Sequence, residues 1–342
     1  WLWHYTMEDR YLRRNPKLAV KSVRQTLANY PDGQRVYPAY ALEMSPTRMN
    51  QPQSLGYTTR ACSASPYRDE LFGPGYEASV FISEPMYNVV HREILVANGA
   101  TFTSHRAEDE KEREFLASTD VWFRPTMSKT GPDGALYVAD FYRFVLEHPE
   151  WIAPETQARL DLRGGAEKGR IYRVCPEEKR PRAIPNLAKL DEPKLVRAMD
   201  SPSGWQRDTV QRLLMEGRAG KSADAVRGLR KVFGQAADPK VRAQVVATIG
   251  ALGVQGMDLQ EIVRAGLRDA HPQVRIQALR AAEHGASKAM GKLFLALVLG
   301  VERDPEFTVR RQLAFTLGEL RGGEAEGEAM QALARMADRE GA

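Results

Sequence analysis

The sequence Asp238-Pro239-Lys240-Val241-Arg242 returns in altered form three more times in the second half of the chain. The arginines that end the four copies are spaced by 35, 33 and 35 residues (242 − 207, 275 − 242 and 310 − 275). A fixed period in this range is typical of stacked helical repeats. We therefore predict an α–α solenoid of about four helix pairs over residues 191–342.

The residue types in each copy also favour the start of a helix. Asp is a good N-cap, and Pro is tolerated at the first helical position because its missing N–H costs nothing there. An apolar stripe follows, for example Val241, Val245 and Ile249, which neither helix of a pair can bury alone. The pattern resembles the HEAT repeat family. It departs from that family at His271, which replaces Asp, and before Val309, where the fourth copy has one extra residue.

The recurring arginines suggest a structural ladder that pairs with acidic or carbonyl groups of the adjacent repeat. A surface that recognises an anionic partner is the alternative for the same side chains. Either way, we expect a protein partner on the helical repeats. The ladder would consist of Arg207, Arg242, Arg275 and Arg310.

Residues 1–175 have a different composition, with aromatics, Pro, Gly and short β-rich runs. Gly75–His91 aligns with Gly131–His148: each has a Gly turn, a short strand, an acidic residue, an aromatic turn and a second apolar strand. The acidic residues, Glu84 and Asp140, lie 56 residues apart (140 − 84), a plausible period for a propeller blade. We predict a partial β-propeller of about three blades with strands at 57–61, 79–83, 123–129, 135–139 and 169–174. Residues 176–190 would form a basic, Pro-rich linker.

Four stretches carry a family resemblance: Phe115–Pro125, Thr130–Arg143, Glu147–Trp151 and Gly169–Arg173. They resemble the membrane-bound dehydrogenases of planctomycetes and related bacteria. Those are large secreted proteins with a propeller like that of the glucose/sorbosone dehydrogenases, followed by HEAT repeats and often a c-type cytochrome domain. The resemblance implies a periplasmic or secreted portion of a quinoprotein sugar or alcohol dehydrogenase, with pyrroloquinoline quinone as its cofactor.

The chain departs from that family in two ways. Sugar dehydrogenases of this fold have a catalytic His before the Gly-Pro-Asp-Gly turn, where this chain reads Trp122-Phe123-Arg124-Pro125. About three blades also leave a ring open, so we expect another chain, a removed segment or self-association to complete it. A non-catalytic propeller–HEAT scaffold for protein–protein interaction is the alternative function. No Cys-x-x-Cys-His motif occurs, and two cysteines are too few for a self-contained zinc or haem c site.

Arginine and lysine residues on the predicted inner strands are candidates for binding the cofactor. Arg60, Arg124 and Lys129 would suit its carboxylates, since a guanidinium binds carboxylate with two parallel hydrogen bonds. The two arginines have an alternative role as braces between neighbouring blades. Their partners would then be Asp120, Asp140 or Glu84.

Two histidines are weak candidates for a catalytic base. His91 and His148 follow the second strand of each aligned copy, and a His can accept a hydroxyl proton during hydride transfer. Both positions fall toward the outer part of a blade, which equally favours a structural or surface role. Glu84 and Asp140 lack the run of acidic residues typical of a calcium loop, so we predict no metal site.

Charge and hydropathy exclude some further classes of protein. The formal charge is +5, but 49 basic residues are interspersed with 44 acidic ones, which favours a solvated surface over a nucleic-acid interface. No run of eighteen apolar residues occurs, so we expect no transmembrane helix. Cys62 and Cys175 could form a disulfide in an oxidising compartment. The chain begins without Met, and we expect it to be part of a longer protein.

Overall fold

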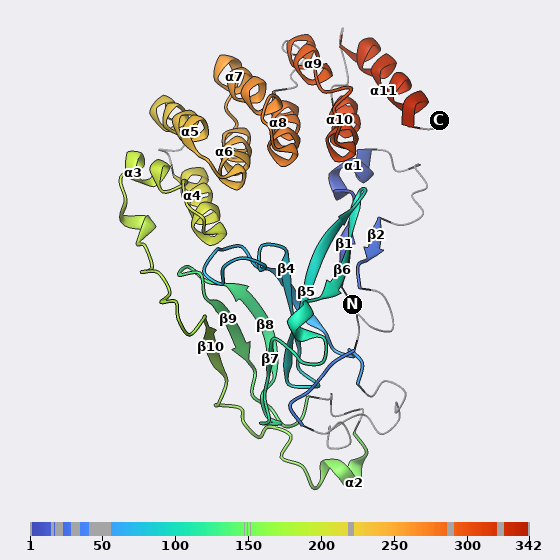
Figure 1. Cartoon of the computed structure of the whole chain (residues 1–342), viewed down its shortest axis with the longest axis vertical. Helices are drawn as coiled ribbons and strands as arrows, with labels where there is room; N and C mark the ends of the chain where they lie inside the picture. Colours follow the sequence, from blue (N-terminus) through green and yellow to red (C-terminus); the bar gives the residue numbers. More distant parts are fainter. Residues whose placement is uncertain are drawn as a thin grey trace. The chain divides into compact units, whose positions relative to one another are not determined.

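The computed structural model describes residues 2–14, 17, 23–28, 35–40, 56–146, 148, 150, 152–217, 222–285, 291–319 and 325–340. The chain divides into two compact units, Trp1–Ala183 and Ile184–Ala342. The first contains antiparallel β-sheets and the second contains helices (Figure 1). The predicted combination of a β-rich part and a helical part is confirmed.

Two sheets form most of the first unit. The first sheet has the order β3 (Cys62–Pro66), β4 (Ser79–Glu84), β5 (Val89–Asn98) and β6 (Thr101–Arg106), and β7 (Leu116–Ala117) also pairs with β5. The second sheet has the order β10 (Arg170–Val174), β9 (Leu136–Asp140) and β8 (Pro125–Thr130). A small sheet joins β1 (Trp3–Tyr5) to β2 (Arg24–Thr26). Every neighbouring pair is antiparallel. The unit also has short helices α1 (Asp9–Arg14), η4 (Glu108–Glu110) and α2 (Pro154–Gln157).

The predicted strands at 79–83, 123–129, 135–139 and 169–174 lie within about two residues of β4, β8, β9 and β10. Two others fail: the first inner strand, and the second strand of the copy Gly131–His148, because the described residues 141–146 form no strand. The prediction of a strand at 57–61 is wrong, because β3 begins at Cys62 and Tyr57 forms only an isolated bridge with Arg35. The β3 strand is irregular: Ser63 has φ +52°, and the register with β4 shifts between Cys62 and Ser65. A bulged strand has no clean two-residue alternation, so the sequence pattern gave no signal for it.

The two sheets pack face to face and bury aromatic and aliphatic side chains between them. The first sheet contributes Phe81 and Val90, and the second contributes Leu136 and Val138. Tyr67 and Phe123 complete this cluster from the connecting segments. Such burial provides the main favourable free energy of sheet packing.

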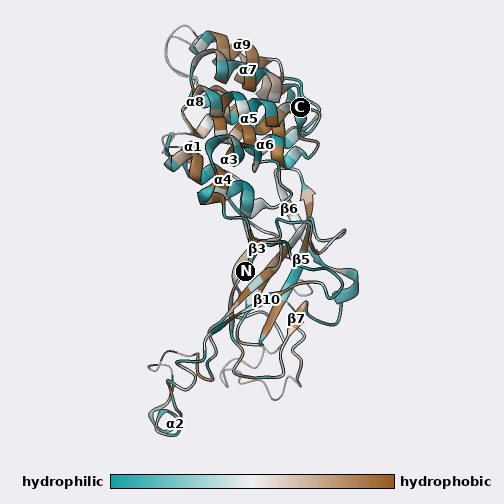
Figure 2. Ribbon diagram, turned by 90° about the vertical axis from the view of Figure 1, so that its left-hand side faces the viewer, coloured by the Kyte–Doolittle hydropathy of each residue, from teal (hydrophilic) through white to brown (hydrophobic). Residues whose placement is uncertain are grey.

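Consecutive helices of the second unit pack as pairs, and the second helices of the pairs also pack against one another (Figure 1). Figure 2 shows hydrophobic and hydrophilic residues alternating around these helices. The buried aliphatic side chains form one continuous core. The helices are α3 (Glu192–Arg197), α4 (Gly204–Glu216), α5 (Ala223–Gln235), α6 (Pro239–Ala251), α7 (Gly256–Leu267), α8 (Pro272–His284), α9 (Gly291–Leu299), α10 (Phe307–Glu319) and α11 (Glu326–Glu340), after a short turn η6 (Leu187–Lys189).

The helix starts follow from the repeated motif. The Asp238 side chain accepts a hydrogen bond from the backbone N–H of Lys240 at 2.8 Å, and Pro239 opens α6. At the next copy, His271 replaces Asp and its Nδ1 accepts from the backbone N–H of Gln273 at 3.2 Å. An imidazole nitrogen can therefore accept a hydrogen bond from a backbone N–H that has no partner within the helix, as the Asp side chain does in the other copy.

The Pro-rich segment 176–190 spans the boundary between the two units. The backbone N–H of Arg182 donates to the carbonyl of Asp133 at 3.1 Å, and its guanidinium pairs with Asp69. The chain up to Arg182 is thus bonded to the β-sheet unit. Among the helices described, none is long and apolar enough to cross a membrane.

Candidate functional site

Arg124 is almost completely buried, and its guanidinium is surrounded by backbone carbonyls. It donates to Pro85, Arg143 and Phe144 at 2.7–2.9 Å, and more weakly to Met86 at 3.4 Å. These acceptors lie just after β4 and just after β9, so one side chain joins the ends of both sheets. Burial lowers the pKa of Arg124 to about 10. The side chain braces the two sheets through carbonyls rather than through acidic residues.

A carboxylate ends each of the two equivalent strands, β4 and β9, and binds the backbone in the same way. Glu84, at the end of β4, accepts from the backbone N–H of Arg60 at 2.9 Å, and Asp140, at the end of β9, accepts from that of Arg124 at 2.8 Å. Each also accepts from the backbone N–H two residues further on, at 3.3 Å and 2.8 Å respectively. Both carboxylates are buried, and the strand pairs β3–β4 and β8–β9 each have a shift in register. We call this arrangement the carboxylate latch.

Glu84 has a titration range that the sequence did not indicate. Burial raises the pKa of Glu84 to about 7, against the lowering effect of hydrogen bonds from the backbone of Arg60 and Met86. A carboxyl group that titrates near neutral pH can exchange protons in that range, but a general base must also reach its substrate. Glu84 is fully buried, and both of its oxygens accept backbone hydrogen bonds. Sequence reasoning weighed this residue only as an ion-pair or calcium partner, because burial is not visible in a local motif.

The structure does not bring the three predicted cofactor-binding cations together. The guanidinium of Arg124 is used inside the protein. Lys129 is exposed on β8, and the preceding residue, Ser128, points to the first sheet, where its Oγ lies 3.0 Å from that of Ser83. Because neighbouring residues of a strand point to opposite faces, Lys129 points away from the first sheet. Arg60, in contrast, lies near enough to Arg124 for its charge to add to burial in lowering the pKa of Arg124.

His91 lies on β5 and is fully buried between two carboxylates. Its Nδ1 is 2.8 Å from Glu114 Oε2, and its Nε2 is 2.8 Å from Glu93 Oε1. Burial alone would lower the pKa of His91, but the hydrogen bonds to Glu114 and Glu93 outweigh it and raise the pKa. An imidazolium, with two N–H donors, satisfies both carboxylates at once. The side chain therefore holds its proton in a structural network.

The same network extends to β6 and to an earlier segment of the chain. Glu114 Oε1 accepts from Arg106 at 2.7 Å and from the backbone N–H of Tyr37 at 2.9 Å. Arg106 also donates to the carbonyl of Arg35 at 2.6 Å. Burial would raise the pKa of Glu114, but the hydrogen bonds with His91 and Arg106 hold it below its usual range. The network thus fastens residues 35–37 to the first sheet.

His148, the other candidate for a catalytic base, differs from His91 in its surroundings, and so do the two cysteines. His148 is exposed, and its Nδ1 accepts from the backbone N–H of Glu150 at 3.4 Å. Cys62 and Cys175 are both free thiols. Burial, together with the nearby charge of Glu84, raises the pKa of Cys62 to about 11. Within the described ranges, no group of three or more His, Cys, Asp or Glu side chains is placed to hold a metal ion.

Arginines of the helical repeats join neighbouring helix pairs. Arg242 forms two hydrogen bonds with Asp269, at 2.6 and 2.9 Å, and Arg275 forms two with Asp304, at 2.7 and 2.8 Å. Each of these arginines also donates to two carbonyls just before its own helix. Arg207 and Arg310 make such carbonyl bonds too, to Ser201 and to Asp304 and Pro305. Of the four arginines of the predicted ladder, Arg242 and Arg275 thus form ion pairs with the next repeat, and we call these two arginine–aspartate pairs the ladder.

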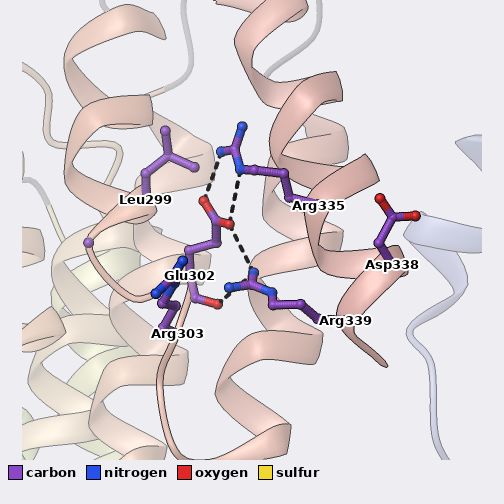
Figure 3. Close-up of a pocket in the computed structure, with 7 residues that line it drawn as sticks. Leu299, Glu302, Arg303, Arg335, Asp338 and Arg339 are labelled. Atoms are coloured by element: carbon purple, nitrogen blue, oxygen red, sulfur yellow. Dashed lines mark hydrogen bonds and ion pairs between the residues drawn. The ribbon is translucent and has the colours of Figure 1, made fainter. Parts of the chain in front are cut away.

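A pocket of about 540 Å³ lies between the turn after α9 and helix α11 (Figure 3). Glu302 is at its centre and accepts two hydrogen bonds from Arg335, at 3.2 and 2.8 Å, and one from Arg339, at 2.9 Å. Arg339 also donates to the carbonyl of Glu302 at 3.3 Å. The lining further includes Leu299, Gly300, Arg303 and Asp338.

The charges of this pocket favour an anionic ligand. Its three guanidinium groups outnumber its two carboxylates, and Glu302 is already bound to two of them. The hydrogen bond from Arg335 lowers the pKa of Glu302, so this carboxylate stays ionised and fixes both arginines in place. Arg303 is exposed at the same pocket. Arginines fixed in this way can bind a carboxylate at a small entropic cost.

Comparison with known families gives one result. Residues 1–178 match the model of a family described as a domain of unknown function (DUF7133). This match covers more than half of the 342 residues. No curated protein matches the chain. By its β-sheet unit, the chain belongs to the DUF7133 family.

Proposed function

We propose that this chain is the framework and partner-binding portion of a secreted or periplasmic propeller–HEAT protein related to the quinoprotein sugar dehydrogenases. In this proposal the first sheet is one blade, the second sheet is part of the next, and the helix pairs are HEAT-like repeats. The antiparallel order β3–β4–β5–β6 in the first sheet, to which β7 adds a fifth strand beside β5, supports the blade assignment. The contact between β3 and β8 supports it as well, since each of these strands lies at one edge of its sheet.

The observation that carries the binding function is the pocket around Glu302. Two arginines are held by one carboxylate at the surface of a helical stack that the ladder stiffens. Helical repeats provide extended surfaces for protein partners. We propose that the partner inserts an acidic side chain or an acidic segment into this pocket, where Arg303 and Arg339 can receive it.

The test uses a fluorescently labelled peptide of alternating Asp and Glu as the probe. We expect the unchanged chain to bind it, with affinity that falls as salt increases. The double variant Arg303→Ala/Arg339→Ala removes the two guanidinium groups that receive the probe, and charge-assisted hydrogen bonds are worth about 1.5–3 kcal/mol each, so affinity should fall by roughly tenfold or more. Arg212→Ala, which removes an exposed helical arginine paired with Glu216, is the matched control. Equal affinities of the double variant and the control would contradict this function.

Catalysis by this chain is the second candidate, and the raised pKa of Glu84 is the observation in its favour. Pyrroloquinoline quinone carries three carboxylates and needs cations that converge on it. The described residues do not fit it, since Arg124 is used internally and Lys129 lies on the opposite face. We therefore propose no reaction step for this chain, and assign the quinone to other parts of a complete propeller.

The dehydrogenase alternative has a direct test of its own. The purified chain is mixed with pyrroloquinoline quinone and calcium, then scanned for a bound quinone and assayed for dye reduction with a panel of aldoses. We expect neither a retained quinone nor dye reduction. A retained quinone with sugar-dependent reduction would show that the chain is catalytic by itself, and Glu84→Ala would then be the first variant to examine.

A further inference from the structure

The carboxylate latch, present in both sheets, allows the two sheets to be aligned residue by residue. Because Glu84 and Asp140 occupy equivalent positions, Phe81 corresponds to Tyr137, and Ser83 to Ala139. In the first sheet, the face with Phe81 and Ser83 is covered by the second sheet. The equivalent face of the second sheet can therefore be compared with a face whose packing is known.

That equivalent face is exposed and has an apolar row across all three strands. Ala139 pairs with Met127 on one side and with Ile171 on the other. The residues Met127 and Ile171 are 49% and 70% exposed. Lys129 and Arg173 border the row on the same face. We call the row Met127–Ala139–Ile171 the tail face. Apolar side chains in register on an open sheet mark an interaction surface.

The other end of the stack also has an exposed apolar face. Val80 and Ile82 of the first sheet are covered by Leu2 and Leu27, which flank the β1–β2 ribbon. His4 of this ribbon points inward, with its Nδ1 3.0 Å from Thr101 Oγ1.

The alternate residues of β1 point outward. Trp3 is 47% exposed and Tyr5 is 62% exposed, and the guanidinium of Arg24 lies 4.6 Å from the centre of the Trp3 ring. We call Trp3 and Tyr5 the head face.

We propose that two copies of this chain associate head to tail, with the head face of one copy packed on the tail face of the next. The contact continues the sheet-on-sheet packing already present inside each copy. It pairs two different surfaces of the same unit, so it is heterologous and leads to a ring or to an open chain of copies. It also covers an apolar row that a lone copy leaves in water. This inference rests on the blade-like stacking in the proposed function and is independent of the pocket around Glu302.

The test is sedimentation velocity of the full chain over a wide range of concentrations, with one variant for each face. The unchanged chain should form dimers and larger species as concentration rises. Ile171→Asp in the tail face and Tyr5→Asp in the head face should each weaken association by at least about tenfold, because a charge replaces a buried apolar group. A mixture of the two variants should restore dimers alone, since one intact head and one intact tail remain.

Met257→Asp is the matched control, because Met257 is equally exposed but lies on α7 of the helical unit. It should associate like the unchanged chain, and circular dichroism should show that all variants are folded. Three outcomes would overturn the proposal: a chain that stays monomeric at every concentration, a Tyr5→Asp variant that still dimerises, or a mixture that remains monomeric. Loss of peptide binding at the pocket would leave this result unchanged, so the two proposals fail separately.

Discussion

Replacing Arg275 by Met should destabilise the helical unit strongly. The Arg275 and Asp304 side chains are only 11% and 6% exposed, and two hydrogen bonds join them. The guanidinium also donates to the carbonyls of Asp269 and Ala270, both at 2.9 Å. Removing one partner of a buried ion pair costs about 3–5 kcal/mol, because the remaining charge stays buried without its partner. We expect the free energy of unfolding to fall by that amount.

The measurements are urea unfolding, which gives the free energy, and thermal unfolding, which gives the melting temperature. Both are followed by far-UV circular dichroism, which reports mainly on the helices. For a unit of this size, each kcal/mol lowers the melting temperature by about 2–4 °C, so the melting temperature should fall by roughly 6–20 °C. Arg212→Met is the control, because Arg212 and Glu216 are both 60% exposed and such a helical pair contributes about 0.3–0.5 kcal/mol.

The reasoning is refuted if Arg275→Met and Arg212→Met lower stability equally. A double-mutant cycle with Asp304→Asn separates the pair from other effects. If the pair is the cause, the second substitution should cost much less in the Arg275→Met background than alone. Additive effects would mean that the loss comes from the bonds to the two carbonyls just before α8, and not from the ion pair with Asp304.

Three further predictions concern the β-sheet unit. Since the pKa of His91 is raised on folding, its charge should stabilise the fold below the unfolded pKa of about 6.5, and this stabilisation should disappear as pH rises through the folded pKa. Urea midpoints measured across pH should therefore fall over that range, and His91→Gln should make this fall smaller. Arg124→Met should lower the free energy of unfolding by about 3–5 kcal/mol, whereas the exposed Lys129→Met should change it by less than about 0.5 kcal/mol, as thermal melting can show. Iodoacetamide at neutral pH should modify Cys175 quickly and Cys62 slowly, because a thiol with a pKa of about 11 stays protonated; intact and peptide masses distinguish the sites, and equal rates would contradict the burial of Cys62.

The helix pairs could be predicted from the sequence because their signals are local. The Asp-Pro start of α6 and the apolar stripe after it lie within one helix, and the period of the arginines indicates their stacking. The β-hairpins could be aligned through Glu84 and Asp140 for a similar reason. The acidic residue is the last residue of β4 in one copy and of β9 in the other, and it binds the backbone two residues on, so its place in the motif is fixed by local geometry.

The environments of the candidate residues could not be predicted, because they depend on residues far away in the sequence. His91 meets Glu114, which lies 23 residues later in a loop. Arg124 binds carbonyls on both sheets, and no side-chain pattern marks a carbonyl acceptor. The pocket was missed as well, since Glu302 and Arg335 are 33 residues apart and belong to different repeats. A regular spacing of charges would have been needed to find it, and none is present.

The aspartates of the ladder have a mechanical consequence. Asp304 binds Arg275 of the preceding helix pair and also accepts the backbone N–H of Glu306, just before α10 begins. Asp269 does the same for Arg242 and for His271, just before α8. A single carboxylate at the joint between two helix pairs therefore binds both the arginine of the preceding pair and the backbone N–H of the residue just before the next helix. A pulling force that opens the joint also frays that helix, so the stack should extend in jumps of a whole helix pair.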